Sequence, residues 1–238
     1  MMHAKCFNVK YGTPHRHLQK KSILTSMLVT FEGPEGAGKT TVISLVKEML
    51  IAEGLLVYIT REPGSGAIGG LIRETLLHGE YMDAKTELFL FLADRAQHVV
   101  EVLQPALKSG KIVLCDRYID STIVYQGYGR GFNLNLLRQF NEVATDGLKP
   151  DLTILLDIDP KAGLQRQQKK DRLDQESLEF HQKVREGFLS ESKQEPKRWK
   201  VIDASLPIEE VSHKTYQAIL DQEKSLKKQK ATYKFLAL

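Results

Sequence analysis

The sequence predicts an α/β fold of three layers, in which helices cover both faces of a five-stranded parallel sheet. Short apolar runs typical of strands alternate with segments of helical periodicity that are long enough to cross over between parallel strands. The length of 238 residues suits one large α/β domain. We expect strands at 27–32, 55–60, 112–116, 152–157 and 199–202, with helices at 39–53, 68–78, 84–109, 134–146, 176–194 and 207–222. Asp159 followed by Pro160 predicts the start of one more short helix.

The first expected strand and helix are joined by a phosphate loop of the form G-x-x-x-x-G-K-[ST]. Its residues are Gly33, Pro34, Glu35, Gly36, Ala37, Gly38, Lys39 and Thr40, followed by Thr41. Glycines let backbone amides surround phosphate oxygens, and the start of the next helix adds a positive dipole. Lys39 places an ammonium on the outer phosphates, and the Thr40 hydroxyl can ligate Mg²⁺. The strand before the motif and the helix after it therefore predict a P-loop NTPase fold.

Charged residues follow the next three expected strands. Arg61 follows the second strand, where it could face a ligand phosphate or simply be a solvated loop residue. Asp116 ends the third strand and Asp157 ends the fourth, and each has the position of a carboxylate that holds Mg²⁺ beside the phosphate loop. Arg117 next to Asp116 favours Asp116, because phosphoryl transfer needs cations around the transferred group.

Two further segments have more than one reading. Phe89 and Phe91 lie two residues apart in an expected helix, so they point about 200° apart, and one of them is free to meet a ligand. Residues 164–174 follow the fourth strand and hold several cations, among them Arg166 and Arg172. Such a segment is a solvated helix end in most proteins, but it can also be a mobile lid that brings positive charge to the phosphates.

The net charge of +4 comes from the two ends of the chain. Residues 1–26 contribute +5 and residues 221–238 contribute +3, so residues 27–220 carry −4. We expect both ends to be disordered and the folded part to bind no nucleic acid. No apolar run is long enough to cross a membrane, and we expect a cytoplasmic protein. Cys115 lies in an apolar strand and is expected to be a small buried side chain.

Four motifs in this order resemble thymidylate kinases of the bacterial type. They are 31–41, then Thr60-Arg61-Glu62-Pro63-Gly64, then Asp116-Arg117-Tyr118, then Tyr125-Gln126-Gly127, and the resemblance runs from about Met27 to Leu220. It implies transfer of the γ-phosphate of ATP to dTMP with Mg²⁺, for dTTP synthesis, in a homodimer. It also implies a kinase domain at 27–220 with its lid at about 164–175, an N-terminal extension at 1–26 and a basic tail at 221–238.

The resemblance assigns roles to individual residues. Lys39 and the amides of the phosphate loop would hold ATP, with Thr40 and Asp116 on the metal. Glu35 would approach the 3′-hydroxyl of the acceptor sugar. The dTMP pocket would consist of Arg61 and Arg117 on the phosphate, Phe91 on thymine, Arg95 on a base carbonyl, Tyr125 near the 2′ carbon, and Arg73, Thr122 and Gln126 around them. Arg166 and Arg172 of the lid would supply charge in the transition state.

The sequence departs from the family pattern after Arg61. Relatives commonly read Pro-Gly-Gly and end the loop with an acid, whereas this chain has Ser65 after Gly64 and Gly70 at the end. Residues 1–26 have no counterpart in the pattern. Two other functions stay open on the sequence alone: another P-loop nucleotide or deoxynucleoside kinase, and a nucleotide-dependent switch or nucleic-acid motor that uses the basic ends.

Overall fold

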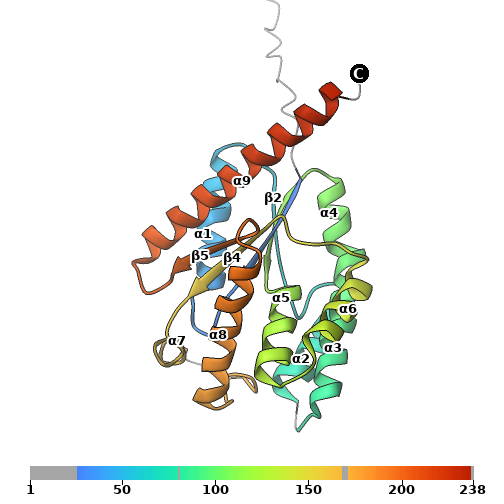
Figure 1. Cartoon of the computed structure of the whole chain (residues 1–238), viewed down its shortest axis with the longest axis vertical. Helices are drawn as coiled ribbons and strands as arrows, with labels where there is room; N and C mark the ends of the chain where they lie inside the picture. Colours follow the sequence, from blue (N-terminus) through green and yellow to red (C-terminus); the bar gives the residue numbers. More distant parts are fainter. Residues whose placement is uncertain (1–25, 80, 168–170, 237–238) are drawn as a thin grey trace, which may run out of the picture.

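A computed structural model describes residues 26–79, 81–167 and 171–236 of the chain, with side chains up to 229. Five strands form one parallel sheet in the order β2-β3-β1-β4-β5. The strands are β1 (Met27–Glu32), β2 (Val57–Arg61), β3 (Ile112–Asp116), β4 (Leu152–Asp157) and β5 (Trp199–Asp203). Figure 1 shows the sheet between layers of helices, so the expected three-layer α/β fold is confirmed.

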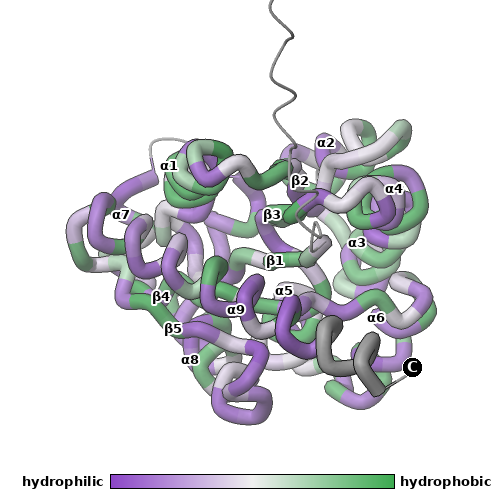
Figure 2. Tube along the Cα trace, turned by 90° about the horizontal axis from the view of Figure 1, so that it is seen from above, coloured by the Kyte–Doolittle hydropathy of each residue, from purple (hydrophilic) through white to green (hydrophobic). Residues whose placement is uncertain are grey.

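Strand β1 lies at the centre of the sheet and is buried along its whole length. Met27, Val29 and Phe31 pack on the face covered by α1 (Lys39–Ala52) and α9 (Ile208–Leu236). Leu28 faces the other side, where it packs against the segment that precedes β3. Burial on both faces explains why the strands read as continuous apolar runs rather than alternating ones. In Figure 2 the central strands are coloured largely as hydrophobic, and α8 at the rim largely as hydrophilic.

The second face carries more helices than the first. Next to the sheet are the π-type turns η1 (Val99–Leu103) and η2 (Ile123–Gly129), with α4 (Gln104–Lys108), α5 (Ile119–Thr122) and α8 (Leu178–Gln194). Farther out lie α2 (Gly69–His78), α3 (Ala84–His98) and α6 (Leu134–Thr145), which Figure 1 shows side by side. The short helix α7 (Pro160–Arg166) begins after Asp159, whose carboxylate accepts a hydrogen bond from the backbone of Ala162, as expected of an N-cap.

Three helical segments differ from the sequence expectation. The helix expected over 84–109 is divided into α3, η1 and α4, because Pro105 has no N–H to continue the α-helical hydrogen bonds, and the π-type segment η1 lies directly before α4. The helical residues 119–129 were not expected at all, since their glycines and polar residues resemble a loop. The third difference is the length of α9.

The expectation of disorder at residues 221–238 is wrong for 221–236, which continue α9. Leu226 packs against the core, and Gln222 donates to the carbonyl of Asp151 at 2.9 Å. Lysine, glutamine and alanine are good helix formers, and net charge cannot distinguish a solvated helix from a solvated coil. Residues 1–25 and 237–238 lie outside the described residues. Within the part of the chain that the structure describes, no helix is both long and apolar enough to cross a membrane.

Candidate active site

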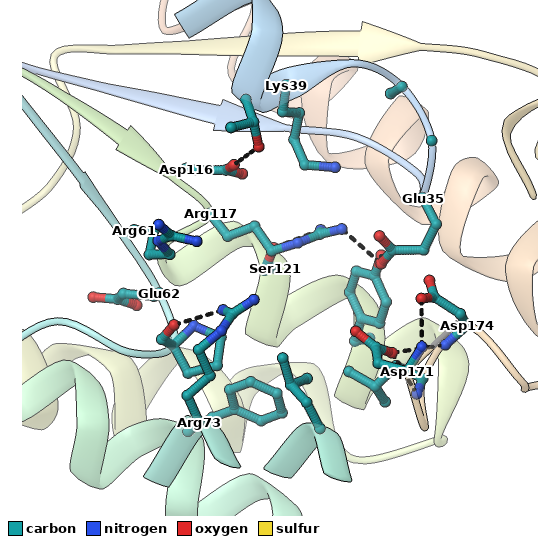
Figure 3. Close-up of a pocket in the computed structure, with 18 of the residues that line it drawn as sticks. Glu35, Lys39, Arg61, Glu62, Arg73, Asp116, Arg117, Ser121, Asp171 and Asp174 are labelled. Carbon is teal, nitrogen blue, oxygen red and sulfur yellow. Dashed lines mark hydrogen bonds and ion pairs between the residues drawn. The ribbon is translucent and has the colours of Figure 1, made fainter. Parts of the chain in front are cut away.

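The carboxyl ends of β1, β2 and β3 open into one cavity of about 590 Å³. The phosphate loop forms one wall, the loop after β2 and the helix α3 form another, and described lid residues form a third (Figure 3). Most of the residues singled out in the sequence line this cavity, namely Glu35, Gly36, Ala37, Gly38, Lys39, Thr40, Thr41, Arg61, Arg73, Phe91, Arg95, Asp116, Arg117, Thr122, Tyr125, Gln126 and Arg166. Ligands of parallel α/β sheets bind at this edge.

The phosphate loop requires glycine where it passes close to other backbone. Gly36 has φ +70°, and a Cβ there would lie 1.9 Å from the carbonyl oxygen of Gly163 at α7. Gly33 has φ +141° and would meet the carbonyl oxygen of Leu156 at 2.3 Å. The Nζ of Lys39 donates to the carbonyl oxygens of Gly33 and Pro34, at 3.0 Å each. The side chain of Lys39 is thus bound to the first two residues of the phosphate loop.

The electrostatic surroundings of Lys39 favour an anion. Burial lowers the pKa of its ammonium, and the nearby guanidinium of Arg117 lowers it further. A negatively charged phosphate beside these two cations would offset both effects. The site therefore suits a ligand that carries several negative charges.

The structure distinguishes the two carboxylates that end β3 and β4. The hydroxyl of Thr40 donates to Asp116 at 3.1 Å, so these two side chains lie together beside the phosphate loop. Asp157 instead binds Arg185 with both oxygens, at 2.8 and 2.9 Å. Of the two carboxylates, Asp116 is therefore the one that lies beside the phosphate loop, and its role as a metal ligand stays a prediction.

Arg117 connects the phosphate loop to the rest of the cavity. Its guanidinium binds Glu35 at 2.6 Å and lies over the ring of Tyr125, whose hydroxyl also donates to Glu35 at 2.6 Å. Burial alone would raise the pKa of Glu35, but the charges of Arg117 and Lys39 outweigh it and bring that pKa to about 2. Glu35 is thus ionised at every physiological pH.

The position of Arg117 depends on a second, deeper carboxylate. Glu32 accepts from the backbone N–H of Tyr118 at 2.8 Å and from the hydroxyl of Ser121 at 2.6 Å. Arg117 itself has φ 67°, in the left-handed region that non-glycine residues rarely adopt. Burial, together with the nearby Asp120, raises the pKa of Glu32 to about 8. The turn after β3 is therefore held by the buried side chain of Glu32, the last residue of β1.

Arg61 and Arg73 add positive charge on the side of the cavity formed by the loop after β2. Arg73 donates to the carbonyl oxygen of Pro63 at 2.8 Å, and burial followed by the charge of Arg61 lowers the pKa of Arg73. Figure 3 shows Lys39, Arg61, Arg73 and Arg117 around the same open space. Four cations from four separate elements meet here, which is an arrangement suited to phosphate.

The far end of the cavity suits a planar, partly polar group. Phe91 lines the cavity, whereas Phe89 lies outside against Phe140, so it is Phe91 that can meet a ligand. Gln126 donates from Nε2 to Glu87 at 2.6 Å, and its buried Oε1 accepts no hydrogen bond from the described residues. A carboxylate only accepts hydrogen bonds, so the Nε2 of Gln126 must face Glu87 and its Oε1 must face away from Glu87.

Arg95 is held more tightly than the sequence suggested. The side chain is 2% exposed and donates to Glu62, Thr122, Asn141 and the carbonyl of Tyr118, at 2.6 to 3.0 Å. It lines the cavity, yet its N–H groups already have protein partners. A base carbonyl could bind Arg95 only by replacing or sharing one of them.

The two lid arginines occupy different places. Arg166 lines the cavity near the phosphate loop and donates to the carbonyl of Ala204 at 3.1 Å. Arg172 points away from the phosphate loop, because buried Glu87 and the carbonyl of Leu76 at the end of α2 attract its guanidinium. The structure thus places Arg166 beside the phosphate loop and Arg172 beside Glu87, and the expectation that one or both of them supply charge in the transition state stays a prediction. Residues 168–170 of this segment lie outside the described residues.

The chain is similar to known proteins in both its sequence and its structure. The family model for thymidylate kinase matches residues 31–215. A thymidylate kinase of Desulfovibrio desulfuricans is 49% identical over 78% of this chain and 91% of its own length. The chain belongs to the thymidylate kinase family. A thymidylate kinase of Staphylococcus haemolyticus is 48% identical over 82% of this chain and 98% of its own, and the crystal structure of the Ehrlichia chaffeensis enzyme superposes with a TM-score of 0.68, at 36% identity, over 82% of this chain and 98% of that one.

Several residues of this thymidylate kinase site were missed by reasoning from the sequence. Glu62, Asp171, Leu173 and Asp174 line the cavity, and Glu87 lies behind it. Glu62 stands in a motif that the sequence analysis quoted, and Asp171 to Asp174 stand in the lid, so position offered a signal for these. For Glu87 the signal was weaker, namely an acid on the apolar side of an expected helix; in the structure this side chain is only 1% exposed.

A glutamine at position 35 would test the electrostatics of the site. Glu35 has a folded pKa of about 2 against 4.5 for the free group, so its charge stabilises the fold above about pH 4.5, and this stabilisation is lost as the pH falls toward 2. We expect Glu35→Gln to lower the free energy of unfolding by about 2 kcal/mol at neutral pH and by less at about pH 4. Urea unfolding followed by circular dichroism over this range measures the difference.

The matched control for that series is Glu48→Gln on the exposed face of α1. It should change the free energy of unfolding little at any pH. A Glu35→Gln difference that stays constant with pH would contradict a strongly depressed pKa.

Proposed function

We propose that this enzyme transfers the γ-phosphoryl group of ATP to dTMP, giving dTDP and ADP on the route to dTTP for DNA replication. One observation carries the proposal: the phosphate loop and a second group of cations share a single cavity whose far end is lined by Phe91 and Gln126. A kinase must hold a donor and an acceptor nucleotide in one water-excluding site. We assign this activity to the domain at 27–220 and to the cytoplasm, where nucleotide pools are used.

The acceptor end matches thymine in its hydrogen-bonding pattern. Because Glu87 takes the Nε2 of Gln126, the amide oxygen is left to accept a hydrogen bond. The imide N–H of thymine is such a donor, whereas the same ring position of cytosine is an acceptor and would leave two lone pairs facing each other. Phe91 offers a face for stacking, and Tyr125 lies where it can crowd a 2′-hydroxyl. Arg61, Arg73 and Arg117 then surround the acceptor phosphate.

The donor end is built from the phosphate loop. Its amides and Lys39 would bind the β- and γ-phosphates of ATP. Thr40 and Asp116 fit Mg²⁺, because their oxygens lie together at 3.1 Å beside the loop and Mg²⁺ takes few protein oxygens plus phosphate oxygens. When bound, the ion would neutralise charge between the phosphates. Glu35 would approach the 3′-hydroxyl of the acceptor's sugar, with Arg117 and Tyr125 holding its carboxylate in place, while an oxygen of the dTMP phosphate receives the phosphoryl group.

A panel of acceptors in a coupled assay with ATP tests this proposal. We expect kcat/KM for dTMP to exceed that for dCMP and for ribonucleotides by at least about a hundredfold, because unpaired polar groups penalise the wrong base. Lys39→Ala should reduce turnover of dTMP by at least about a hundredfold. A loss of this size would show that the activity belongs to this protein and not to a contaminating kinase. Equal use of dTMP and dCMP by the folded protein would show that the acceptor is another nucleotide.

The lid arginines are expected to affect different kinetic constants. Arg166 is the lid arginine near the phosphates, so Arg166→Ala should lower kcat by about a hundredfold or more and leave KM for dTMP nearly unchanged. Arg172 holds the lid against Glu87 beside the base pocket, so Arg172→Ala should instead raise KM for dTMP by about tenfold. Steady-state kinetics of both variants, with exposed Lys161→Ala as the control, measures the difference.

The opposite result is equally clear. If Arg172→Ala lowers kcat as much as Arg166→Ala and leaves KM unchanged, Arg172 moves to the phosphates during the reaction.

We also propose that the enzyme is a homodimer that pairs through α3 and α6. Phe89 is 56% exposed on α3 and packs against Phe140 of α6, and Val143 is 79% exposed three residues farther along α6. Two more exposed apolar residues lie nearby in sequence, Val100 in η1 directly after α3 and Leu136 one turn before Phe140 in α6. Contiguous apolar residues on two adjacent helices are typical of a protein interface.

Sedimentation velocity tests this interface. Val143 is exposed, so Val143→Lys should fold normally and sediment as a monomer where the wild type sediments as a dimer. Ile51→Lys, at an exposed apolar position of α1, is the matched control and should remain dimeric. A dimer in both variants would place the interface elsewhere.

A further inference from the structure

A buried chain of hydrogen bonds joins the loop after β2 to helix α3. The Nδ1 of His98 lies 2.8 Å from Glu62, and its Nε2 lies 2.7 Å from the hydroxyl of Thr60. Thr60 in turn meets the hydroxyl of Ser65 at 2.9 Å. At the other end, Glu62 accepts from Arg95 at 2.8 Å. The chain thus runs Ser65, Thr60, His98, Glu62, Arg95, and we call it the relay.

Every group in the relay has a suitable partner. Glu62 only accepts, so Nδ1 of His98 must carry the hydrogen. The hydroxyls of Thr60 and Ser65 both donate and accept, so either direction beyond His98 leaves no atom unpaired. His98 is fully buried, and Thr60 and Glu62 are nearly so. Buried hydrogen bonds that are completely satisfied fix the geometry of the groups that they join.

The relay places Arg61 between two anchored neighbours. Side chains of an extended segment alternate in direction, so the inward pointing of Thr60 and Glu62 turns Arg61 toward the cavity. Figure 3 shows Arg61 beside the open space, which Glu62 also borders, although the carboxylate of Glu62 is bound by Arg95 and His98. The hydroxyl of Ser65 also accepts from the backbone N–H of Arg61 at 3.4 Å. The backbone of Arg61 is therefore held by Thr60 before it and by Glu62 after it, since both are bound to His98.

Ser65 supplies the last hydroxyl of the relay. Without this hydroxyl the relay would end at Thr60. With it the relay continues back to the backbone N–H of Arg61. Ser65 is thus an added anchor for the arginine that faces the cavity.

We propose that Thr60, His98 and Ser65 are positioning residues that aim Arg61 at the phosphate of the acceptor nucleotide. The proposal rests on the proposed function only in taking dTMP as that acceptor. None of the three lines the cavity, so they act through Arg61. Their removal should weaken recognition of the phosphate and spare recognition of the base, because Arg95 keeps Glu62, Thr122 and Asn141 as partners.

The experiment compares dTMP with thymidine, which has the same base and sugar but no phosphate. Thr60→Val keeps the shape of the side chain and removes its hydroxyl, and Ser65→Ala does the same in the loop. We expect each variant to raise KM for dTMP by about tenfold with kcat changed less than about twofold. Binding of thymidine, measured by calorimetry, should stay at the wild-type level. The double variant should be no worse than Thr60→Val, because both changes break one chain.

Three controls separate positioning from general damage. Thr60→Ser restores the hydroxyl and should recover the KM of the wild type. Thr215→Val and Ser109→Ala remove hydroxyls that bond only to carbonyls of their own helices, and they should change neither ligand. If Thr60→Val does not fold, the Ser65→Ala variant still gives the comparison, since Ser65 lies in a loop and is only partly buried.

The outcomes are distinguishable. A KM for dTMP that is unchanged in the Thr60 and Ser65 variants overturns the proposal, and so does an equal loss of thymidine and dTMP binding. If the wild type itself does not phosphorylate dTMP, the proposed function fails. A wild type that uses dTMP, with variants that match it, shows that the relay alone is wrong.

Discussion

The hydrogen bonds that Glu32 makes to the turn after β3 are the interaction on which the site depends. They hold the backbone of Tyr118 and the hydroxyl of Ser121 against the end of β1, the central strand. With that turn fixed, Asp116 faces Thr40 of the phosphate loop and Arg117 faces Glu35. The raised pKa of Glu32 reflects the cost of burying a carboxylate at this depth. One buried acid thereby holds the turn that carries Asp116 and Arg117 to the phosphate loop.

Much of this architecture could be predicted from the sequence, because it depends on local signals. Apolar runs located all five strands to within two residues, and the glycines and lysine of the phosphate loop located one wall of the cavity. The segment 119–129 was missed, since its helix is stabilised by packing against α6 and α8 rather than by its own periodicity. Likewise α9 extends past Leu220 through contacts that composition does not reveal.

The parts of the site that could not be predicted depend on residues far apart in the chain. Asp157, which ends a strand as Asp116 does, is bound by Arg185, 28 positions later. Arg172 is bound by Glu87, 85 positions earlier. The sequence identified which side chains are capable of the chemistry. Which of them are free to perform it depends on pairings that only the folded chain creates.

Those pairings also change what binding a phosphate means for this protein. Lys39 is bonded to two carbonyl oxygens, Arg73 to one, and Arg117 to Glu35. An arriving phosphate therefore exchanges one set of oxygen partners for another and gains only the difference between them. A small free anion gains little from such an exchange. A nucleotide brings a base and a sugar as well, so the internal oxygens act as competitors that raise the selectivity of the site for whole nucleotides over inorganic phosphate.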